Sequence, residues 1–177
     1  MSQETLCFPT SIEPPVEVYR DPYTVISRRT AYFPGFTKEY FCWGRGLRSS
    51  IIPICGDQIL LTRQYRFNAN RISMEIPGGA VEAGEEPMAA AVRECLEETN
   101  IRCLNPQPLI NFQPDLDTYH NPTFIFFADL LEGVAAEDER FLWLPFKEAE
   151  RLVHAGEIND ALSVIGILAL AKRFAPC

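Results

Sequence analysis

The chain concentrates acidic residues around one arginine in a single short segment. The members of this group are Glu85, Arg93, Glu94, Glu97 and Glu98. Carboxylate oxygens are the ligands that hard divalent cations such as Mg²⁺ prefer, and such cations neutralise phosphate oxygens during hydrolysis. The interleaved arginine adds a cationic donor that suits phosphates and carboxylates alike. The segment therefore predicts a divalent-metal site for phosphate chemistry.

A helix must position these groups, and the sequence predicts one from Pro87 to Thr99. Proline suits the first turn of a helix, and most of the residues that follow are good helix formers. At about 100° per residue, Glu94, Glu97 and Glu98 share one face. The residues expected to pack on a core from the opposite face are Met88, Val92, Cys95 and Thr99.

Like charges at this spacing repel one another, which is unfavourable for an isolated helix. A cation bound among the carboxylates would remove that cost. The alternative is an ordinary solvated acidic helix whose glutamates face water. Helix geometry alone leaves both interpretations open.

The segment from Gly79 to Ile101 resembles the Nudix box, the signature of the Nudix hydrolases, written G-x5-E-x7-R-E-U-x-E-E-x-G-U with U apolar. Asn100 is the one departure, because the family has glycine there. The backbone after a helix commonly turns left-handed, and asparagine tolerates this better than most residues. We therefore interpret Asn100 as a geometric substitute. The matching residues are Gly79, Glu85, Arg93, Glu94, Cys95, Glu97, Glu98 and Ile101.

The resemblance extends outside the box, from about Val16 to the C-terminal helix. R-Q-Y-R at Arg63–Arg66 and M-E-I-P-G-G at Met74–Gly79 are similar to the run before the box in ADP-ribose pyrophosphatases and related nucleoside diphosphate sugar hydrolases. Methionine replaces the common tryptophan of that run, and Gly78 replaces the common alanine. The resemblance implies an α/β (α+β) fold: the Nudix α/β/α sandwich with a mixed sheet and a small N-terminal antiparallel sheet.

The resemblance also implies a metal site. Family members bind their cation through box glutamates, which makes Glu94 and Glu98 the expected direct ligands of Mg²⁺, with Mn²⁺ as a possible substitute. Glu97 is expected to bind directly or through water. The backbone carbonyl before the box glycine also binds metal in the family, and here that carbonyl belongs to Gly78.

Arginines have separate expected roles. Arg93 either contacts phosphate or orients the box carboxylates by ion pairing; we favour orientation, with Glu85 as its partner. The resemblance places Arg66 on the substrate phosphates, with Arg63 as a weaker candidate, and structural salt bridges are the alternative for both. Arg29 lies among aromatic residues that can reach a nucleotide, also across a dimer; an ordinary strand surface is the alternative.

The loop at residues 114–122 departs most from the family. ADP-ribose pyrophosphatases generally carry a glutamate there, assigned to the base or to a metal, whereas this loop reads P-D-L-D-T-Y-H-N-P. Asp115, Asp117 and His120 are possible substitutes, with Asp117 favoured; a turn-forming role is the alternative for the aspartates. Otherwise the base is a box glutamate, first of all Glu97. The expected catalytic residues are Glu97, Glu98, Arg93 and Asp117.

The function implied by the resemblance is Mg²⁺-dependent hydrolysis of the pyrophosphate bond in a nucleoside diphosphate linked to another moiety. The first expected substrate is ADP-ribose, which would give AMP and ribose 5-phosphate. Another nucleotide sugar, a dinucleotide or a modified nucleotide is the alternative. A non-catalytic nucleotide sensor with the same fold is an alternative of a different class.

Bulk properties limit the partners. The net charge of −8 argues against nucleic-acid binding, which needs basic surfaces, but a small-molecule substrate is compatible with it. No apolar run approaches the ~20 residues of a membrane span, and the start lacks the plan of a secretory signal. We therefore expect a cytoplasmic protein, with no membrane partner, whose cysteines are free thiols.

We expect a tail at residues 1–15 and one domain at 16–177, in which the strands of 16–45 help to form a homodimer, as the resemblance implies. A hairpin is expected at Gly56-Asp57. The expected strands are 16–19, 24–32, 38–43, 50–55, 58–66, 74–76, 123–131 and 141–144, and the expected helices are 87–99, 145–155 and 159–174.

Overall fold

The computed structural model describes residues 7–22, 24–133 and 138–174. The chain forms two compact units. The small unit comprises Met1–Gly46 and Gln113–Asn121, and the large unit comprises Leu47–Phe112 and Pro122–Cys177. The small unit is therefore built from two separate stretches of sequence, the second of which interrupts the large unit.

The small unit contains a five-stranded sheet. Its β3–β4 hairpin turns at Gly35, where φ is 91°, and β2 and β1 both pair antiparallel with β3. β11, from the loop at residues 114–122, joins β4 in parallel and was not expected. β1 lies within the stretch expected to be a tail. The strands are β1 (Ser11–Ile12), β2 (Val16–Arg20), β3 (Val25–Phe33), β4 (Phe36–Gly44) and β11 (Tyr119–His120).

The large unit is built on a seven-stranded mixed sheet. Its central order is β10-β12-β5-β6-β14, with β7 paired to β6 and β8 paired to β5. β12 and β5 run parallel, and the other pairs are antiparallel. The strands are β5 (Arg48–Cys55), β6 (Gln58–Arg66), β7 (Arg71–Glu75), β8 (Gly78–Ala80), β10 (Gln107–Phe112), β12 (Thr123–Ala128) and β14 (Phe141–Pro145); β9 (Arg102–Cys103) and β13 (Leu131–Glu132) form a separate pair.

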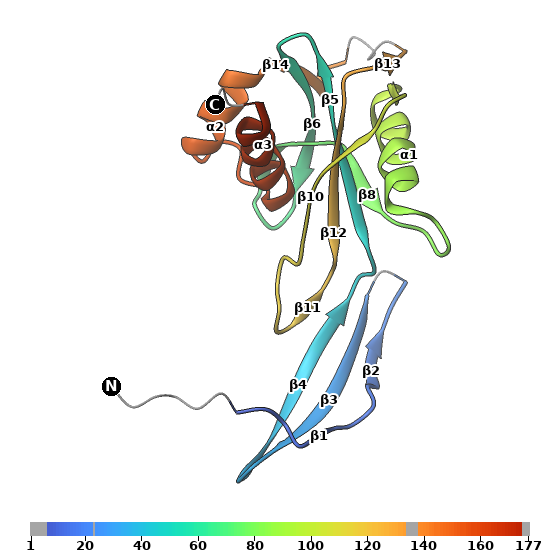
Figure 1. Ribbon diagram of the computed structural model, residues 1–177, viewed down its shortest axis with the longest axis vertical. Helices are drawn as coiled ribbons and strands as arrows, with labels where there is room; N and C mark the ends of the chain where they lie inside the picture. The colour runs from blue at the N-terminus through green and yellow to red at the C-terminus, as the bar shows by residue number, and fades with distance from the viewer. Residues whose placement is uncertain (1–6, 23, 134–137, 175–177) are drawn as a thin grey trace. The chain divides into compact units, whose positions relative to one another are not determined.

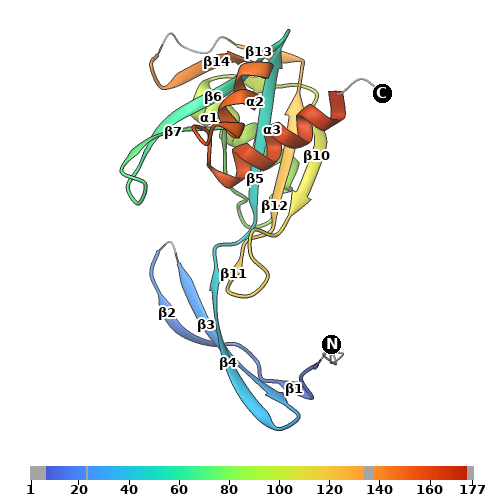
Figure 2. The same ribbon diagram turned by 90° about the vertical axis from the view of Figure 1, so that its left-hand side faces the viewer.

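Helices cover both faces of this sheet (Figure 1). Helix α1 (Pro87–Thr99) packs on one face, and α2 (Phe146–His154) and α3 (Ala161–Phe174) lie together on the other, as the turned view also shows (Figure 2). Adjacent side chains of a strand point to opposite faces, so Ile51 packs in the core under α1 and Ile52 in the core under α2 and α3. The expected α/β/α sandwich is confirmed.

Two further expectations concern membrane-spanning segments and cysteines. No helix in the described part of the sequence is both long and apolar enough to cross a bilayer. The cysteines within the described ranges are free, as expected: they are Cys7, Cys42, Cys55, Cys95 and Cys103, while Cys177 lies outside those ranges.

Helix α1 begins and ends at the residues expected from the sequence. Asn100 follows it with φ 60° and ψ 20°, and its backbone N–H donates to the carbonyl of Leu96 at 2.9 Å. The left-handed conformation expected at Asn100 is thus confirmed. The expectation that Met88 packs on the core is wrong, since Met88 is 38% exposed. The buried face is made by Ala90, Ala91, Cys95 and Thr99, whose small side chains let the helix approach β5 and β8.

The backbone at Asn100 predicts how substitutions there affect stability. Asn100→Ala should lower the free energy of unfolding by about 1 kcal/mol, because a Cβ-bearing residue without a local polar group resists the left-handed region. Asn100→Gly should leave it nearly unchanged. Urea unfolding at neutral pH measures both values. Equal losses for the two variants would contradict a backbone origin.

Candidate active site

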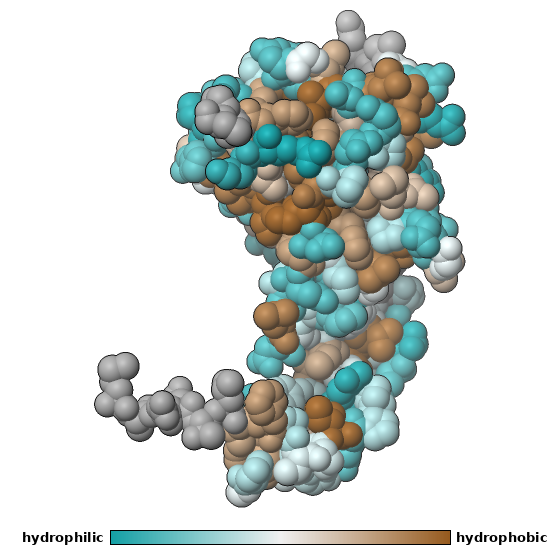
Figure 3. Space-filling view, in the orientation of Figure 1, coloured by the Kyte–Doolittle hydropathy of each residue, from teal (hydrophilic) through white to brown (hydrophobic). Residues whose placement is uncertain are grey.

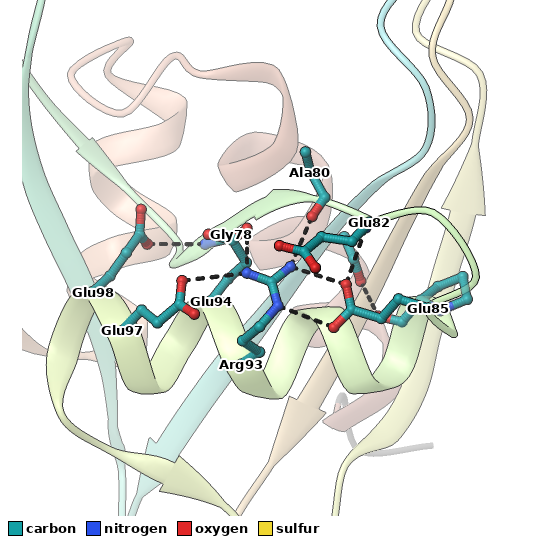
Figure 4. Close-up of polar contacts among 10 residues, drawn as sticks. Gly78, Ala80, Glu82, Glu85, Arg93, Glu94, Glu97 and Glu98 are labelled. Atoms are coloured by element: carbon teal, nitrogen blue, oxygen red, sulfur yellow. Dashed lines mark hydrogen bonds and ion pairs between the residues drawn. The ribbon is translucent and has the colours of Figure 1, made fainter.

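Two box glutamates, Glu94 and Glu98, extend from α1 toward the backbone of β8 (Figure 4). Gly79 lies so close to the helix that a Cβ atom built on it would be 2.1 Å from Cδ of Glu94. The backbone N–H of Gly78 donates to Oε2 of Glu98 at 3.1 Å. The two glycines therefore allow close approach between the strand and two carboxylates of the helix.

Arg93 is bonded to three glutamates and one carbonyl. Its Nε and Nη2 donate to the two carboxylate oxygens of Glu85 at 3.0 and 2.9 Å. Nη1 donates to Glu94 at 3.0 Å and to Glu97 at 3.2 Å, and Nη2 also donates to the carbonyl of Ala80 at 3.0 Å. These contacts match the interpretation in which Arg93 orients the box carboxylates.

Charge pairing at Arg93 shifts the proton equilibria of the pair in opposite directions. Hydrogen bonds to Glu85, and then to Glu94, raise the pKa of the guanidinium above its ordinary value. The bonds from Arg93, together with one from the backbone N–H of Glu82, lower the pKa of Glu85. Both groups are therefore held in their charged forms, which keeps the cluster assembled.

Glu98 is bonded differently from the other box glutamates. Its Oε1 accepts a hydrogen bond from Nε2 of Gln64 at 3.2 Å, and its Oε2 accepts the one from Gly78. Burial raises the pKa of Glu98, the nearby charge of Glu94 adds to this, and the two hydrogen bonds oppose it. No cationic side chain among the described residues bonds to this carboxylate.

The donor set fits a hard divalent cation in its chemistry. Carboxylate oxygens of Glu94, Glu97 and Glu98 come from one helix face, and the space above Gly79 is occupied by one of these carboxylates because a Cβ is absent. No three acidic, histidine or cysteine side chains of the described ranges already converge as a metal site. Glu94 and Glu97 instead form ion pairs with Arg93. Carboxylate oxygens suited to Mg²⁺ are therefore present, but they do not converge on a single point.

The two arginines of β6 point to opposite faces. Arg66 is paired through Nε and Nη2 with the carboxylate of Glu75 on β7, with Nε at 2.7 Å. Arg63 donates to the backbone carbonyl of Glu139 at 3.2 Å. The structure thus shows a salt bridge at Arg66, which was the alternative to substrate binding. Because side chains alternate along a strand, Gln64 shares the face of Arg66 and not that of Arg63.

The Arg66–Glu75 pair predicts a pH-dependent effect on stability. Burial alone would raise the pKa of Glu75, which is 7% exposed, but hydrogen bonds from Arg66 and Ser73 outweigh burial and lower it. A lowered pKa stabilises the fold above the unfolded-state pKa and ceases to do so as the pH falls through the folded-state pKa.

In Arg66→Met, burial would prevail and raise the pKa of Glu75, so this carboxylate would destabilise the fold increasingly as the pH rises. We expect the variant to lose about 2 kcal/mol at pH 7 and clearly less near pH 4. Urea unfolding of both proteins at the two pH values tests this. A difference that does not grow with pH would contradict the assigned cause.

The other predicted residues lie in the small unit. Arg29, Asp115, Asp117 and His120 line a hollow of about 410 Å³, together with Ser27 and Cys42. Oδ1 of Asp115 accepts bonds from the backbone N–H groups of residues 117, 118 and 119, which lower its pKa. The turn-forming role of Asp115 is thus confirmed. The carboxylate of Asp117 has no bonded partner within the described part of the chain.

Sequence reasoning missed Gln64 and the carbonyl of Ala80 as contacts of the cluster. Gln64 was visible in the R-Q-Y-R run, and period-two alternation would have placed it on the face of Arg66. Which element this face meets is decided by tertiary packing. The carbonyl of Ala80 carries no sequence signal, because every residue has one.

Known proteins resemble this chain in sequence and in fold. The NUDIX domain model matches residues 44–162. A CMP-5'-(N-acetyl-N-hydroxy-3-aminopropyl)phosphonate hydrolase from Streptomyces rubellomurinus is 28% identical over 160 residues, which are 86% of this chain and 78% of that protein. An ADP-ribose pyrophosphatase from Mycobacterium tuberculosis is 32% identical over 126 residues, which are 63% of this chain and 58% of that protein. A crystal structure of an ADP compounds hydrolase shares the fold, with a TM-score of 0.79, 18% identity, and coverage of 96% of this chain and 94% of that chain.

Proposed function

This chain belongs to the Nudix family of pyrophosphohydrolases, and from this premise we propose that it hydrolyses, with Mg²⁺, the pyrophosphate bond of a nucleoside diphosphate linked to a second moiety. One observation carries the proposal: α1 brings Glu98 to the backbone of Gly78 and Glu94 to the backbone of Gly79, with Glu97 on the same helix face (Figure 4). A pyrophosphate resists hydrolysis because its negative oxygens repel a nucleophile. A site that holds a cation next to the pyrophosphate lowers the barrier to hydrolysis.

We assign the metal to Glu94 and Glu98, with Glu97 as a third ligand, direct or through water, and with the carbonyl of Gly78. Mg²⁺, or Mn²⁺ in its place, supplies neutralisation of phosphate charge and a lower pKa for bound water. Arg93 holds Glu94 and Glu97 in place through its hydrogen bonds. It acts on the metal ligands and not on the substrate.

Two groups are proposed as the base that takes the proton of the attacking water. Glu97 is the most exposed partner of Arg93, with 59% of its side chain accessible, and has only one contact with it. Asp117 has no bonded partner within the described residues and shares its hollow with Arg29. The proposed phosphate contacts are Arg66, which would share its guanidinium with Glu75, and Arg63; Arg29 is proposed to reach the nucleotide.

ADP-ribose is the first proposed substrate, giving AMP and ribose 5-phosphate. The name of the mycobacterial relative supports it. The Streptomyces relative covers more of this chain and is named for a CMP phosphonate, which favours a modified nucleotide as the second candidate. Another nucleotide sugar or a dinucleotide is the further alternative. The non-catalytic sensor is disfavoured, because binding alone does not require the complete set of box carboxylates.

A substrate panel tests the proposal. Purified protein with Mg²⁺ is incubated with ADP-ribose, other nucleoside diphosphate sugars, a dinucleotide and a CMP phosphonate conjugate, and the products are separated by ion-exchange chromatography. We expect AMP and ribose 5-phosphate from ADP-ribose. Cleavage of the CMP conjugate alone would move the assignment to the second candidate. Tight binding without cleavage of any compound would favour the sensor.

We also propose that the strands at residues 16–45 contribute to a homodimer. Hydrophobic groups lie at the surface of the small unit (Figure 3). Within residues 16–45 the exposed large hydrophobic residues are Val16, Val18, Tyr19, Tyr32, Phe36, Phe41 and Trp43; Phe8, Ile12 and Leu116 are exposed elsewhere in the same unit. Exposed apolar side chains in this number favour association, and sedimentation equilibrium of the purified chain tests it. The division into a tail at 1–15 and one domain at 16–177 and the cytoplasmic location stay predictions.

A further inference from the structure

We propose that Gln64 is a positioning residue, which fixes the carboxylate of Glu98 for a divalent cation without neutralising its charge. This inference rests on the proposed function, because it takes Glu98 to be a metal ligand. It goes further in assigning a role to a side chain of β6, outside the box.

The geometry around Glu98 shows how its carboxylate is held. The amide Nε2 of Gln64 donates to Oε1 at 3.2 Å, and the backbone N–H of Gly78 donates to Oε2 at 3.1 Å. Each oxygen thus has one donor, and the two donors come from different strands, β6 and β8. A carboxylate bonded at both oxygens cannot rotate freely, so its remaining lone pairs keep a fixed direction.

Both donors to Glu98 are neutral groups, whereas the other box glutamates are bonded to the cationic side chain of Arg93. The single positive charge of Arg93 is shared by Glu85, Glu94 and Glu97, each of which forms an ion pair with it. Arg66 lies on the same strand face as Gln64, and its charge acts on Glu98 from a distance, but its guanidinium bonds to Glu75. Glu98 is therefore the box carboxylate that is fixed at both oxygens while no cationic side chain of the described residues is bonded to it, so its charge stays accessible to a cation.

The chemistry of position 64 follows from this arrangement. A lysine there would place an ammonium next to Glu98 and compete with the metal. A methionine would keep nearly the length and shape of glutamine but has no donor, so Glu98 would be held at one oxygen only. Groups that orient metal ligands typically affect metal affinity or activity by about 10–100-fold.

The test measures Mn²⁺ binding directly, by electron paramagnetic resonance of free Mn²⁺ in the absence of substrate. We expect Gln64→Met to weaken Mn²⁺ binding by about 10-fold or more, and Gln64→Lys to weaken it further. The matched control is Tyr65→Phe on the same strand. Tyr65 is 57% exposed, its side chain faces the other way, and within the described residues its hydroxyl bonds only to Asn70. The Mn²⁺ affinity of this variant should equal that of the wild type. At saturating Mg²⁺, kcat of Gln64→Met should recover most of its loss, as expected if metal binding is the affected step.

Folding is measured alongside by urea unfolding, and Gln64→Ala serves as a second donor-free variant if Gln64→Met unfolds. Unchanged Mn²⁺ affinity in a folded donor-free variant, with a wild type that binds Mn²⁺, would overturn this inference and leave the proposed function standing. A wild type that binds no Mn²⁺ but cleaves the substrate without metal would overturn the metal assignment, and this inference with it.

Discussion

Replacing Glu98 with glutamine is expected to reduce kcat by at least about 10³-fold without unfolding the protein. The variant keeps an acceptor oxygen but loses the charge that we assign to metal binding. A metal at a reacting phosphate contributes several kcal/mol, and each 1.4 kcal/mol corresponds to about tenfold in rate. Steady-state assays at saturating Mg²⁺ on the best substrate of the panel measure the loss.

The free energy of unfolding should not fall in Glu98→Gln, in contrast to its kcat. Because burial raises the pKa of Glu98, its ionised form destabilises the metal-free fold increasingly as the pH rises above the unfolded-state pKa. Glutamine carries no charge, so Glu98→Gln should be at least as stable as the wild type at pH 7 in the absence of metal. The control is Glu86→Gln at the N-cap of α1, whose side chain makes no capping hydrogen bond. Near-normal turnover in Glu98→Gln would refute the metal assignment.

The second large effect is expected at Gly79. A Cβ there would lie 2.1–2.3 Å from the three carboxylate atoms of Glu94. These atoms end a flexible side chain, so Gly79→Ala should displace the carboxylate at little cost in folding free energy. Since misplacement of a catalytic group by about 1 Å can cost about 10²-fold, we expect kcat/KM to fall by about that factor.

Gly78→Ala provides the matched comparison. Its Cβ would meet Oγ of Ser50 at 2.2 Å, but also the backbone carbonyl of Ser49 at 2.5 Å and Cα of Ser50 at 2.7 Å. Backbone atoms cannot move aside easily, so we expect a loss of about 2 kcal/mol in unfolding free energy. Urea unfolding and steady-state kinetics on both variants separate the two effects. Equal stability losses at the two glycines would contradict the contact assigned to Glu94.

Local chemistry explains what the sequence predicted well. Helix α1 follows from Pro87 and a run of helix formers, and the turn at Asn100 follows from the few residues that accept a left-handed backbone. The hairpin at Gly56 is confirmed, with Ile54 opposite Ile59. Each of these features depends on residues that are neighbours in the chain.

Features set by packing between distant segments were not predictable in this way. Met88 fits a helical core stripe, yet the small residues Ala90 and Ala91 turn a different face toward the sheet. The parallel pairing of β12 with β5, and of β11 with β4, joins residues far apart in sequence. Gln64 belongs to the same class, because its contact with Glu98 requires β6 to lie next to the end of α1.

The interrupted connectivity of the small unit has a consequence for synthesis on the ribosome. Its first segment ends at Gly46, whereas β11 belongs to the segment Gln113–Asn121. A chain that grows from its N-terminus therefore makes β1–β4 early, but the edge of β4 stays without its parallel partner until the first segment of the large unit, Leu47–Phe112, has been translated. During that interval the edge offers unpaired backbone groups to other nascent chains. Deleting residues 1–46 would create the reverse problem, because β11 would be left without the strand with which it pairs.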